Sequence, residues 1–226
     1  MRVAISDQQP DPVTPYRYIG GDPSIDFVDT ADWIVGGLDR FCSYDRVVEW
    51  AEGAGVLQLP AADSLRAAAW ADPAAADRTL ADAIELRGLL EQLFYDIATG
   101  DSAEAEIARL NRRWLAEYLP PHAVVRSGDG ASFSLSWPNA SHALESPLWS
   151  VAWSAAKLIT SPDVSRIKRC GGLRCGWYYV DRSRNGLRRW CEMETCGTEM
   201  KSLRRAARTA ALRSHQENPN RASPSR

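Results

Sequence analysis

The chain has 226 residues, 45% of them hydrophobic, and a formal net charge of -2 at pH 7. This is enough for one hydrophobic core with a smaller module beside it. No stretch approaches the roughly 20 apolar residues that a transmembrane helix needs, so we expect no membrane contact. The N-terminus has no apolar signal-like run and four of the five cysteines are paired, which argues against a secreted disulfide protein and predicts a cytoplasmic one.

The small net charge conceals an asymmetry along the chain. Residues 1–165 carry 12 basic and 24 acidic side chains, whereas residues 166–213 carry 13 basic and 4 acidic ones. Such an asymmetry indicates contact with an anionic partner, most plausibly nucleic acid. We divide the chain into a flexible arm, an acidic body, a basic module and a disordered tail: 1–15, 16–163, 164–213 and 214–226.

The acidic body has the pattern of a mainly helical domain. Apolar residues recur at helical spacing in four segments, and capping residues or prolines precede several of them. We expect these helices at about 44–57, from Pro73 to Gly100, from 101 or 102 to 118, and from Ser146 to Ile159.

A change of period separates the last two of these helices. The runs 123–126 and 132–137 flank the turn residues 127–130, and the second run alternates strictly between polar and apolar side chains. This pattern predicts a β-hairpin with one buried face.

The body offers no clear catalytic constellation. The pair Gly20-Gly21 lacks the lysine and hydroxyl spacing of a phosphate-binding loop, and the three histidines are scattered. Asp26, Asp29 and Asp32 lie close together in the sequence, but helix caps and solvated faces account for them as well as an acid–base pair does. Cys42 is expected to be a small buried apolar residue. We therefore do not expect an enzyme.

Four cysteines near the C-terminus are the most specific signal in the chain. They form two equally spaced pairs, C-x4-C-x15-C-x4-C: Cys170, Cys175, Cys191 and Cys196. Four thiolates match the closed tetrahedral ligand set of one structural Zn²⁺. An iron–sulfur site and a redox pair are the alternatives.

The segment between the two cysteine pairs predicts a hairpin. Aromatic and branched residues occupy two arms, 177–180 and 187–190, on either side of Asn185-Gly186. This hairpin would bring Cys175 and Cys191 together at its base. The fold class is therefore α+β: a mainly helical N-terminal domain with a small antiparallel hairpin, then a C-terminal zinc hairpin followed by a helix.

The final helix is expected to run from Cys196 to about Arg213, with an apolar face and a basic one. The apolar face, expected to pack on the module, contains Met200, Leu203, Ala207 and Ala210. Arginine and lysine can follow a phosphate backbone, and arginine can also read guanine edges. The residues expected to contact nucleic acid lie on this helix and on the hairpin: Arg182, Arg184, Arg188, Arg189, Lys201, Arg204, Arg205 and Arg208.

Other roles for these basic residues stay open. A Zn(Cys)4 centre carries a formal charge of -2, so some arginines would neutralise it and bond to its sulfurs. Others would dock the module on the acidic body, and a basic helix face is also an ordinary solvated surface.

The module resembles a known family, the CGNR zinc finger. The residues that carry the resemblance are Cys175-Gly-Trp, Asp181-Arg-Ser-Arg-Asn-Gly, Arg188-Arg-Trp-Cys191 and Cys196-Gly197. Upstream, Ile25-Asp-Phe-Val-Asp-Thr30 is similar to the L-D-F-x-N-T signature of the ABATE domain, an α/β domain that precedes this finger. The resemblance covers about residues 16–210 and implies that the four paired cysteines are zinc ligands, that the finger binds DNA, and that the protein is a bacterial stress-related transcription regulator.

One departure from the family motif concerns the start of the last helix. Thr198-Glu199 stands where the family has Asn-Arg after Cys-Gly. An arginine there could contact phosphate, whereas Glu199 would repel it and instead suits a helix N-terminus.

Our leading hypothesis is a transcription regulator that binds DNA through the zinc module, while the N-terminal domain senses a small-molecule effector or forms a homodimer. The alternative is a protein-interaction adaptor whose zinc hairpin docks a partner through four aromatic residues: Trp177, Tyr178, Tyr179 and Trp190. A third hypothesis, an enzyme with its site in the body, would need a pocket with convergent polar groups.

Overall fold

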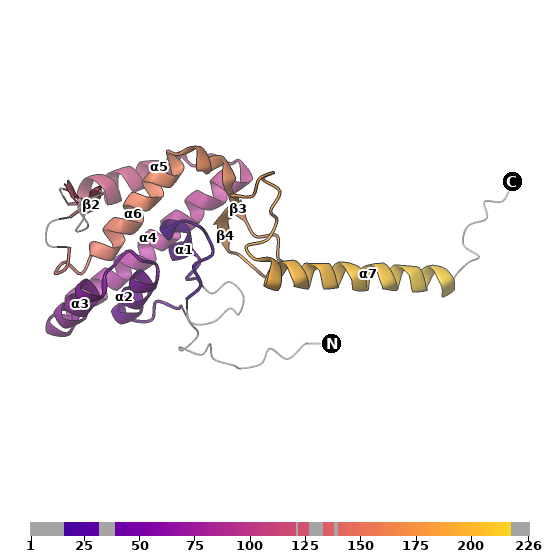
Figure 1. Cartoon of the computed structure of the whole chain (residues 1–226), viewed down its shortest axis with the longest axis horizontal. Coiled ribbons are helices and arrows are strands. Elements are labelled where there is room, and N and C mark those ends of the chain that lie inside the picture. The colour runs from indigo at the N-terminus through magenta and orange to yellow at the C-terminus, as the bar shows by residue number, and fades with distance from the viewer. Residues whose placement is uncertain (1–15, 32–38, 121, 127–132, 138–139, 218–226) are drawn as a thin grey trace.

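A computed structural model describes residues 16–217 apart from 32–38, 121, 127–132 and 138–139 (Figure 1). The arm 1–15, the hairpin turn 127–130, Asp32 and the end of the tail, 218–226, lie outside the described residues. In the part that is described, no helix combines the length and apolar composition needed to cross a membrane.

The N-terminal part is a helical body with one small antiparallel sheet, as the sequence predicts. Its elements are α1 (Pro23–Val28), α2 (Tyr44–Gly53), α3 (Leu59–Ala71), α4 (Pro73–Thr99), α5 (Glu104–Arg109), the π-helix η1 (Leu110–Tyr118), β1 (Ala123–Arg126), β2 (Phe133–Ser136) and α6 (Ser146–Ile159).

The C-terminal part is a second small antiparallel sheet followed by a long helix. Its elements are the 3-10 helix η2 (Pro162–Arg166), β3 (Ile167–Arg169), β4 (Tyr178–Val180), the π-helix η3 (Met193–Gly197) and α7 (Thr198–Glu217). The α+β fold class is therefore confirmed.

The long helix α4 begins and ends where its sequence signals indicate. The Asp72 side chain accepts a hydrogen bond from the backbone nitrogen of Ala75 at 2.9 Å, and Pro73 occupies the first turn. Gly100 ends the helix in the left-handed region, with φ 82°. The next helix begins later than expected, at Glu104, and its second half is the π-helix η1.

Two features of the body differ from expectation. Helix α3 was not predicted from the sequence; it is rich in alanine, and its buried side chains are only Ala62 and Leu65. The β1–β2 hairpin forms with Val124 opposite Leu135, but Val124 is 72% exposed, so the expected burial does not extend to this residue.

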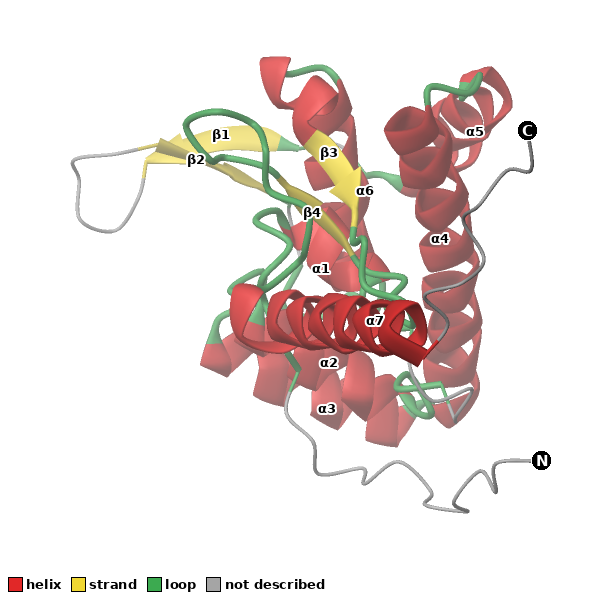
Figure 2. Cartoon of the chain, turned by 90° about the vertical axis from the view of Figure 1, so that its right-hand side faces the viewer, coloured by secondary structure: helices red, strands yellow, loops and turns green. Residues whose placement is uncertain are grey.

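The core lies around α1, which is buried along most of its length. α1 contacts α4, α6 and β4, and these elements surround it in Figure 2. Phe27 from α1 packs edge-on against Trp50 from α2, with ring centroids 5.0 Å apart. The segment Ile25–Thr30, noted in the sequence for its family signature, is thus the centre of the body.

The zinc hairpin forms, but with a different pair of strands. β4 pairs with β3, with Ile167 opposite Val180, and not with the expected arm 187–190. The reason is packing, because Ile167, Tyr178 and Val180 all join the hydrophobic core of the body. The arm 187–190 forms no strand and instead closes over the cysteines.

Helix α7 extends away from the rest of the chain (Figure 1). Every residue from Lys201 to Leu212 is exposed, and Leu203 is 44% exposed. The expectation that the apolar face packs on the module is therefore wrong for the described residues: only the first turn, near Met200, is close to η3.

Candidate metal centre and nucleic-acid interface

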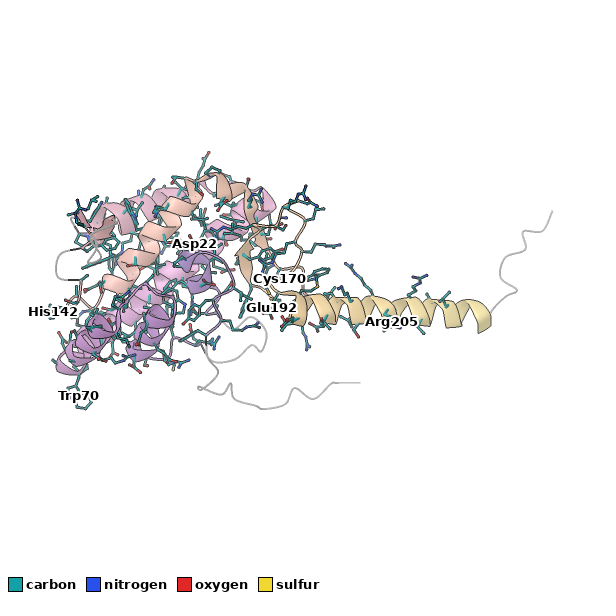
Figure 3. All side chains as sticks on the ribbon, in the orientation of Figure 1. Asp22, Trp70, His142, Cys170, Glu192 and Arg205 are labelled. Atoms are coloured by element: carbon teal, nitrogen blue, oxygen red, sulfur yellow. The ribbon has the colours of Figure 1, made fainter. Side chains whose placement is uncertain are left out.

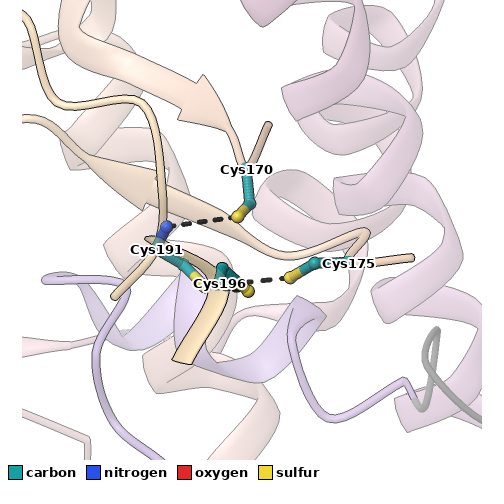
Figure 4. A group of neighbouring side chains, drawn as sticks. All are labelled: Cys170, Cys175, Cys191 and Cys196. Carbon is teal, nitrogen blue, oxygen red and sulfur yellow. Dashed lines mark hydrogen bonds between the residues drawn. The ribbon is translucent and has the colours of Figure 1, made fainter. Parts of the chain in front are cut away.

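The structure brings the four paired cysteines together from positions around β3, β4 and η3 (Figure 4). Cys170 directly follows β3, Cys175 lies in the turn before β4, Cys191 follows the loop after β4, and Cys196 belongs to η3. Their sulfur atoms all lie within 4.8 Å of one another.

The sulfur spacing fits one tetrahedral zinc ion. Cys175 Sγ lies 3.7 Å from Cys191 Sγ, which lies 3.8 Å from Cys196 Sγ. Four ligands on Zn–S bonds of about 2.3 Å place neighbouring sulfurs about 3.8 Å apart in a regular tetrahedron. Three of the cysteines are buried and Cys175 is partly buried, as expected for a closed structural site.

Backbone groups support this cluster. Cys170 Sγ accepts hydrogen bonds from the backbone nitrogens of Gly172, at 3.4 Å, and Cys191, at 3.3 Å. A Cβ atom at Gly172 would lie only 3.1 Å from Cys196 Sγ, so this turn favours glycine. Hydrogen bonds from backbone nitrogens to sulfur orient thiolate ligands and disperse their charge.

The electrostatics of the cluster also favour a bound cation. Hydrogen bonds from the Cys175 and Cys191 thiols lower the pKa of Cys170. Hydrogen bonding to Cys170 raises the pKa of Cys175 to about 12 and also raises the pKa of Cys191. Four adjacent thiolates therefore need a metal ion to hold them together, and Zn²⁺ would supply that charge.

A buried aspartate connects the zinc hairpin to the body. Asp29 Oδ1 accepts a hydrogen bond of 2.8 Å from the backbone nitrogen of Tyr178, and Asp29 is only 3% exposed. Burial raises the pKa of this carboxyl well above its usual range. The sequence analysis took Asp29 as a cap or a solvated residue. It does end α1 as the C-cap, but its side chain is buried at the junction.

A second junction runs through Gly20. Its backbone nitrogen donates to Asp26 Oδ1, and its carbonyl oxygen accepts from the backbone nitrogen of Val180, both at 2.8 Å. A Cβ atom at position 20 would lie 2.4 Å from Ile25 Cγ2, so the close approach requires glycine. Asp26 and Asp29 thus both serve the contact between α1 and β4.

Two of the eight basic residues expected at the nucleic-acid interface make internal contacts. Arg182 Nη1 donates to the carbonyl of Gly21 at 2.7 Å, and its guanidinium lies 3.3 Å from the Asp163 carboxylate. The Arg188 guanidinium stacks on Tyr179 at 4.3 Å and donates to the carbonyls of Trp190 and Cys191. Both arginines therefore match the intramolecular role that the sequence analysis left open.

The other six basic residues are exposed. They lie at the end of the 181–190 loop region and along α7: Arg184, Arg189, Lys201, Arg204, Arg205 and Arg208. The guanidiniums of Arg189 and Arg204 approach the Trp190 ring at 5.8 and 5.9 Å, which brings the loop and the first half of α7 to one aromatic side chain. Arg205 points away from α7 in Figure 3.

The loop that carries Arg184 is organised by a residue that the sequence analysis missed. Asp181 is fully buried and accepts hydrogen bonds from Lys168 Nζ at 2.6 Å and from the backbone nitrogens of Ser183 and Arg188, each at 3.0 Å. Burial alone would raise the pKa of Asp181, but these hydrogen bonds outweigh it and lower the pKa. The only sequence signal was an aspartate directly before a polar turn.

Family comparisons agree with this geometry. A family model described as "CGNR zinc finger" matches residues 166–209. A second one, ABATE, described as "Putative stress-induced transcription regulator", matches residues 21–162, more than half of the chain. No curated protein matches the chain. The sequence resemblance is thus confirmed, and the four adjacent cysteines are those of a zinc finger that could hold one zinc ion. The chain belongs to the ABATE family and carries a CGNR zinc finger at its C-terminal end.

Proposed function

We propose that this protein regulates transcription by binding duplex DNA with helix α7 and the zinc-ordered loop that precedes it. The observation that carries the proposal is the exposure of α7 together with its charge. Residues 201–213 contain five basic side chains and no acidic one, and every residue from 201 to 212 is exposed.

The dimensions of α7 suit the major groove. A helix of 20 residues is about 30 Å long, and the major groove of about 12 Å width admits a single helix. Lys201, Arg204, Arg205 and Arg208 follow the i, i+3, i+4, i+7 spacing, so their side chains share one side of the helix. All four side chains are exposed, although the Arg204 guanidinium approaches the ring of Trp190.

The zinc-ordered loop would add phosphate contacts beside the helix. Asp181 and Lys168 hold the loop from inside, which leaves Arg184 and Arg189 exposed on a fixed backbone. Basic side chains on an ordered loop lose less conformational entropy on binding than the same side chains on a mobile loop.

The departure from the family motif is partly compensated by a neighbour. Arg174 Nη2 lies 3.7 Å from Glu199 Oε1 at the start of α7. The pair is exposed and weak, but the positive charge of Arg174 offsets the repulsion that Glu199 would exert on a phosphate.

The four aromatic residues of the adaptor hypothesis do not form an exposed docking surface in this structure. Trp177, Tyr178 and Tyr179 are buried and Trp190 is only partly exposed, so these rings are not free to bind a partner. We assign no catalytic role to the protein.

The test is a titration of zinc-loaded protein with generic duplex DNA at two or more salt concentrations. Each phosphate neutralised contributes a log–log salt slope of about -0.9. The double variant Arg204→Ala, Arg205→Ala should bind more weakly at low salt, with a slope smaller by about 2.

A matched control separates the site from bulk charge. Arg78→Ala with Arg112→Ala removes two exposed arginines from the body and should leave DNA affinity almost unchanged. Zinc content should be equal in all three proteins. No binding at low salt, or equal losses in the two double variants, would refute the proposal.

A further inference from the structure

A pocket of about 510 Å³ lies where the start of α2, the end of α3 and the start of α4 meet. Its lining includes Cys42, Tyr44, Arg66, Trp70, Asp77 and Leu80. Figure 3 shows Trp70 at the end of the body opposite to α7, so the pocket is separate from the zinc centre.

The pocket has an apolar floor and one prominent aromatic wall. Tyr44 and Ala76 are buried, and the Tyr44 hydroxyl donates to the carbonyl of Leu144 at 2.7 Å, which fixes its ring. Trp70, by contrast, is 88% exposed. A large exposed aromatic side chain beside an apolar hollow is typical of a binding surface.

The charges around the pocket are predominantly negative. Its one basic side chain, Arg66, pairs with three carboxylates: Nε lies 2.9 Å from Asp45 Oδ1, Nη2 lies 2.9 Å from Glu52 Oε2, and Nη1 lies 3.6 Å from Asp63 Oδ1. The Asp77 carboxylate, also at the pocket, is exposed and forms no ion pair with the described residues. An anionic ligand would therefore be repelled by the Asp77 carboxylate and would find the Arg66 guanidinium already paired.

We propose that this pocket binds an organic cation with a large apolar body. The apolar part would lie against Tyr44 and Leu80, while the positive charge lies near the indole face of Trp70 and the Asp77 carboxylate. Cations are attracted to the faces of tryptophan rings, and a nearby carboxylate adds to that attraction. None of the lining residues belongs to the zinc module, so this proposal does not depend on DNA binding.

Two ions of equal shape and opposite charge test the proposal. Calorimetric titration of the zinc-loaded full chain with tetraphenylphosphonium should give saturable binding at one site per chain. Tetraphenylborate, which has nearly the same shape, should bind at least about tenfold more weakly because of the negative lining.

Two variants locate the site. Trp70→Ala should weaken tetraphenylphosphonium binding about tenfold through loss of the cation–π contact, and it should fold normally because Trp70 is exposed. Asp77→Asn should weaken it about threefold at low salt. The control Asp101→Asn removes the same charge just beyond the other end of α4 and should have no effect.

Cys42 is exposed and not buried as the sequence predicts, so its thiol gives an independent readout. It lines the pocket, so bound tetraphenylphosphonium should slow its alkylation by iodoacetamide several-fold, with Cys42→Ser as the blank. Equal affinity for the two ions, unchanged binding in Trp70→Ala, or unchanged alkylation of Cys42 would each overturn the proposal.

Discussion

Asp29 shows how a single side chain can join two parts of a protein. Its carboxylate accepts a hydrogen bond from the backbone N–H of Tyr178 in β4. The partner is a main-chain group, so the contact depends on where β4 lies and not on the identity of the residue at 178. An unpaired backbone N–H in this buried position would be costly.

We predict effects of different size for two substitutions at this position. Asp29→Ala leaves the Tyr178 N–H buried without an acceptor and should lower the free energy of unfolding by about 1–3 kcal/mol. Asp29→Asn keeps an acceptor and removes the cost of burying a carboxylate, so it should have a much smaller effect. Urea denaturation of the zinc-loaded proteins measures both, and equal destabilisation by the two variants would contradict this role.

Asp26 should make stability depend on pH. Burial raises the pKa of Asp26 to about 6 from its usual 3.8, although the hydrogen bond from Gly20 opposes this. The folded state therefore binds more protons than the unfolded chain between these two values, so the contribution of Asp26 to stability falls as pH rises from about 4 to 6. The full change is at most about 3 kcal/mol.

The variant Asp26→Asn removes this titration and keeps an acceptor for Gly20. Relative to wild type, the variant should gain stability between pH 4 and 7. The difference between the two proteins in denaturation experiments is the readout, because zinc release at low pH affects both. A difference that does not change with pH would show that Asp26 keeps an ordinary pKa in the folded protein.

At the scale of elements, α7 is the least supported part of the structure. Most helical stability in proteins comes from packing of an apolar face, whereas residues 201–212 of α7 are all exposed, and Arg204 reaches back to the ring of Trp190. Its stability must therefore come from intrinsic propensity, to which the alanines and arginines of this helix contribute.

We predict that helix propensity in α7 controls DNA affinity. Ala207→Gly costs about 1 kcal/mol of helix stability at an exposed position. It should lower the helical signal in circular dichroism and weaken DNA binding about fivefold, although it removes no charge. Added DNA should restore part of that signal. Unchanged DNA affinity in a variant with reduced helicity would mean that α7 does not bind as a helix.

The sequence predicted those elements whose signals are local. Asp72, Pro73 and Gly100 define α4 through caps and backbone preferences that need no tertiary contact, and the cysteine spacing needs only four ligands. Strand pairing in the module was not predictable in the same way. β4 pairs with β3 because both strands bury side chains in the core of the body, and not with the arm beyond the nearest turn. Helix α3 was not predicted because its alanine-rich sequence has few large apolar residues, so it shows no clear helical repeat of hydrophobic positions. The hydrogen bond from Tyr178 to Asp29 was not predictable because the two residues lie 149 positions apart in the sequence.

At the scale of the whole molecule, the zinc module and the body share one core. Phe94 from α4 packs against Tyr178 from β4 with ring centroids 6.3 Å apart, and Ile167 and Val180 are buried in the same cluster. The guanidinium of Arg17, at the start of the body, lies 5.8 Å from the centre of the Trp177 ring and pairs with Glu192. Ordering of the cysteines should therefore affect residues that lie far from them.

Removal of zinc tests this coupling. If the module were independent, a chelator would unfold it and leave the thermal transition of the body unchanged. With a shared core, loss of zinc frees β4, uncovers Phe94 and the Asp29 carboxylate, and lowers the stability of the body as well. We expect a single calorimetric transition that shifts downward on chelation, by about 2–4 °C for each kcal/mol lost. Cys191→Ser should reproduce the shift without a chelator.

Hydrogen exchange can test this coupling at individual backbone amides. The amide of Tyr178 bonds to Asp29 and the amide of Val180 bonds to Gly20, so both report directly on the junction. Both should be protected in the zinc-loaded protein and should exchange much faster after chelation, together with amides of α1. Fast exchange confined to 181–197 would instead show that the body holds β4 without help from the metal. In that case the zinc would order only the loop and the start of α7, and it would act on the proposed DNA-binding surface without changing the body.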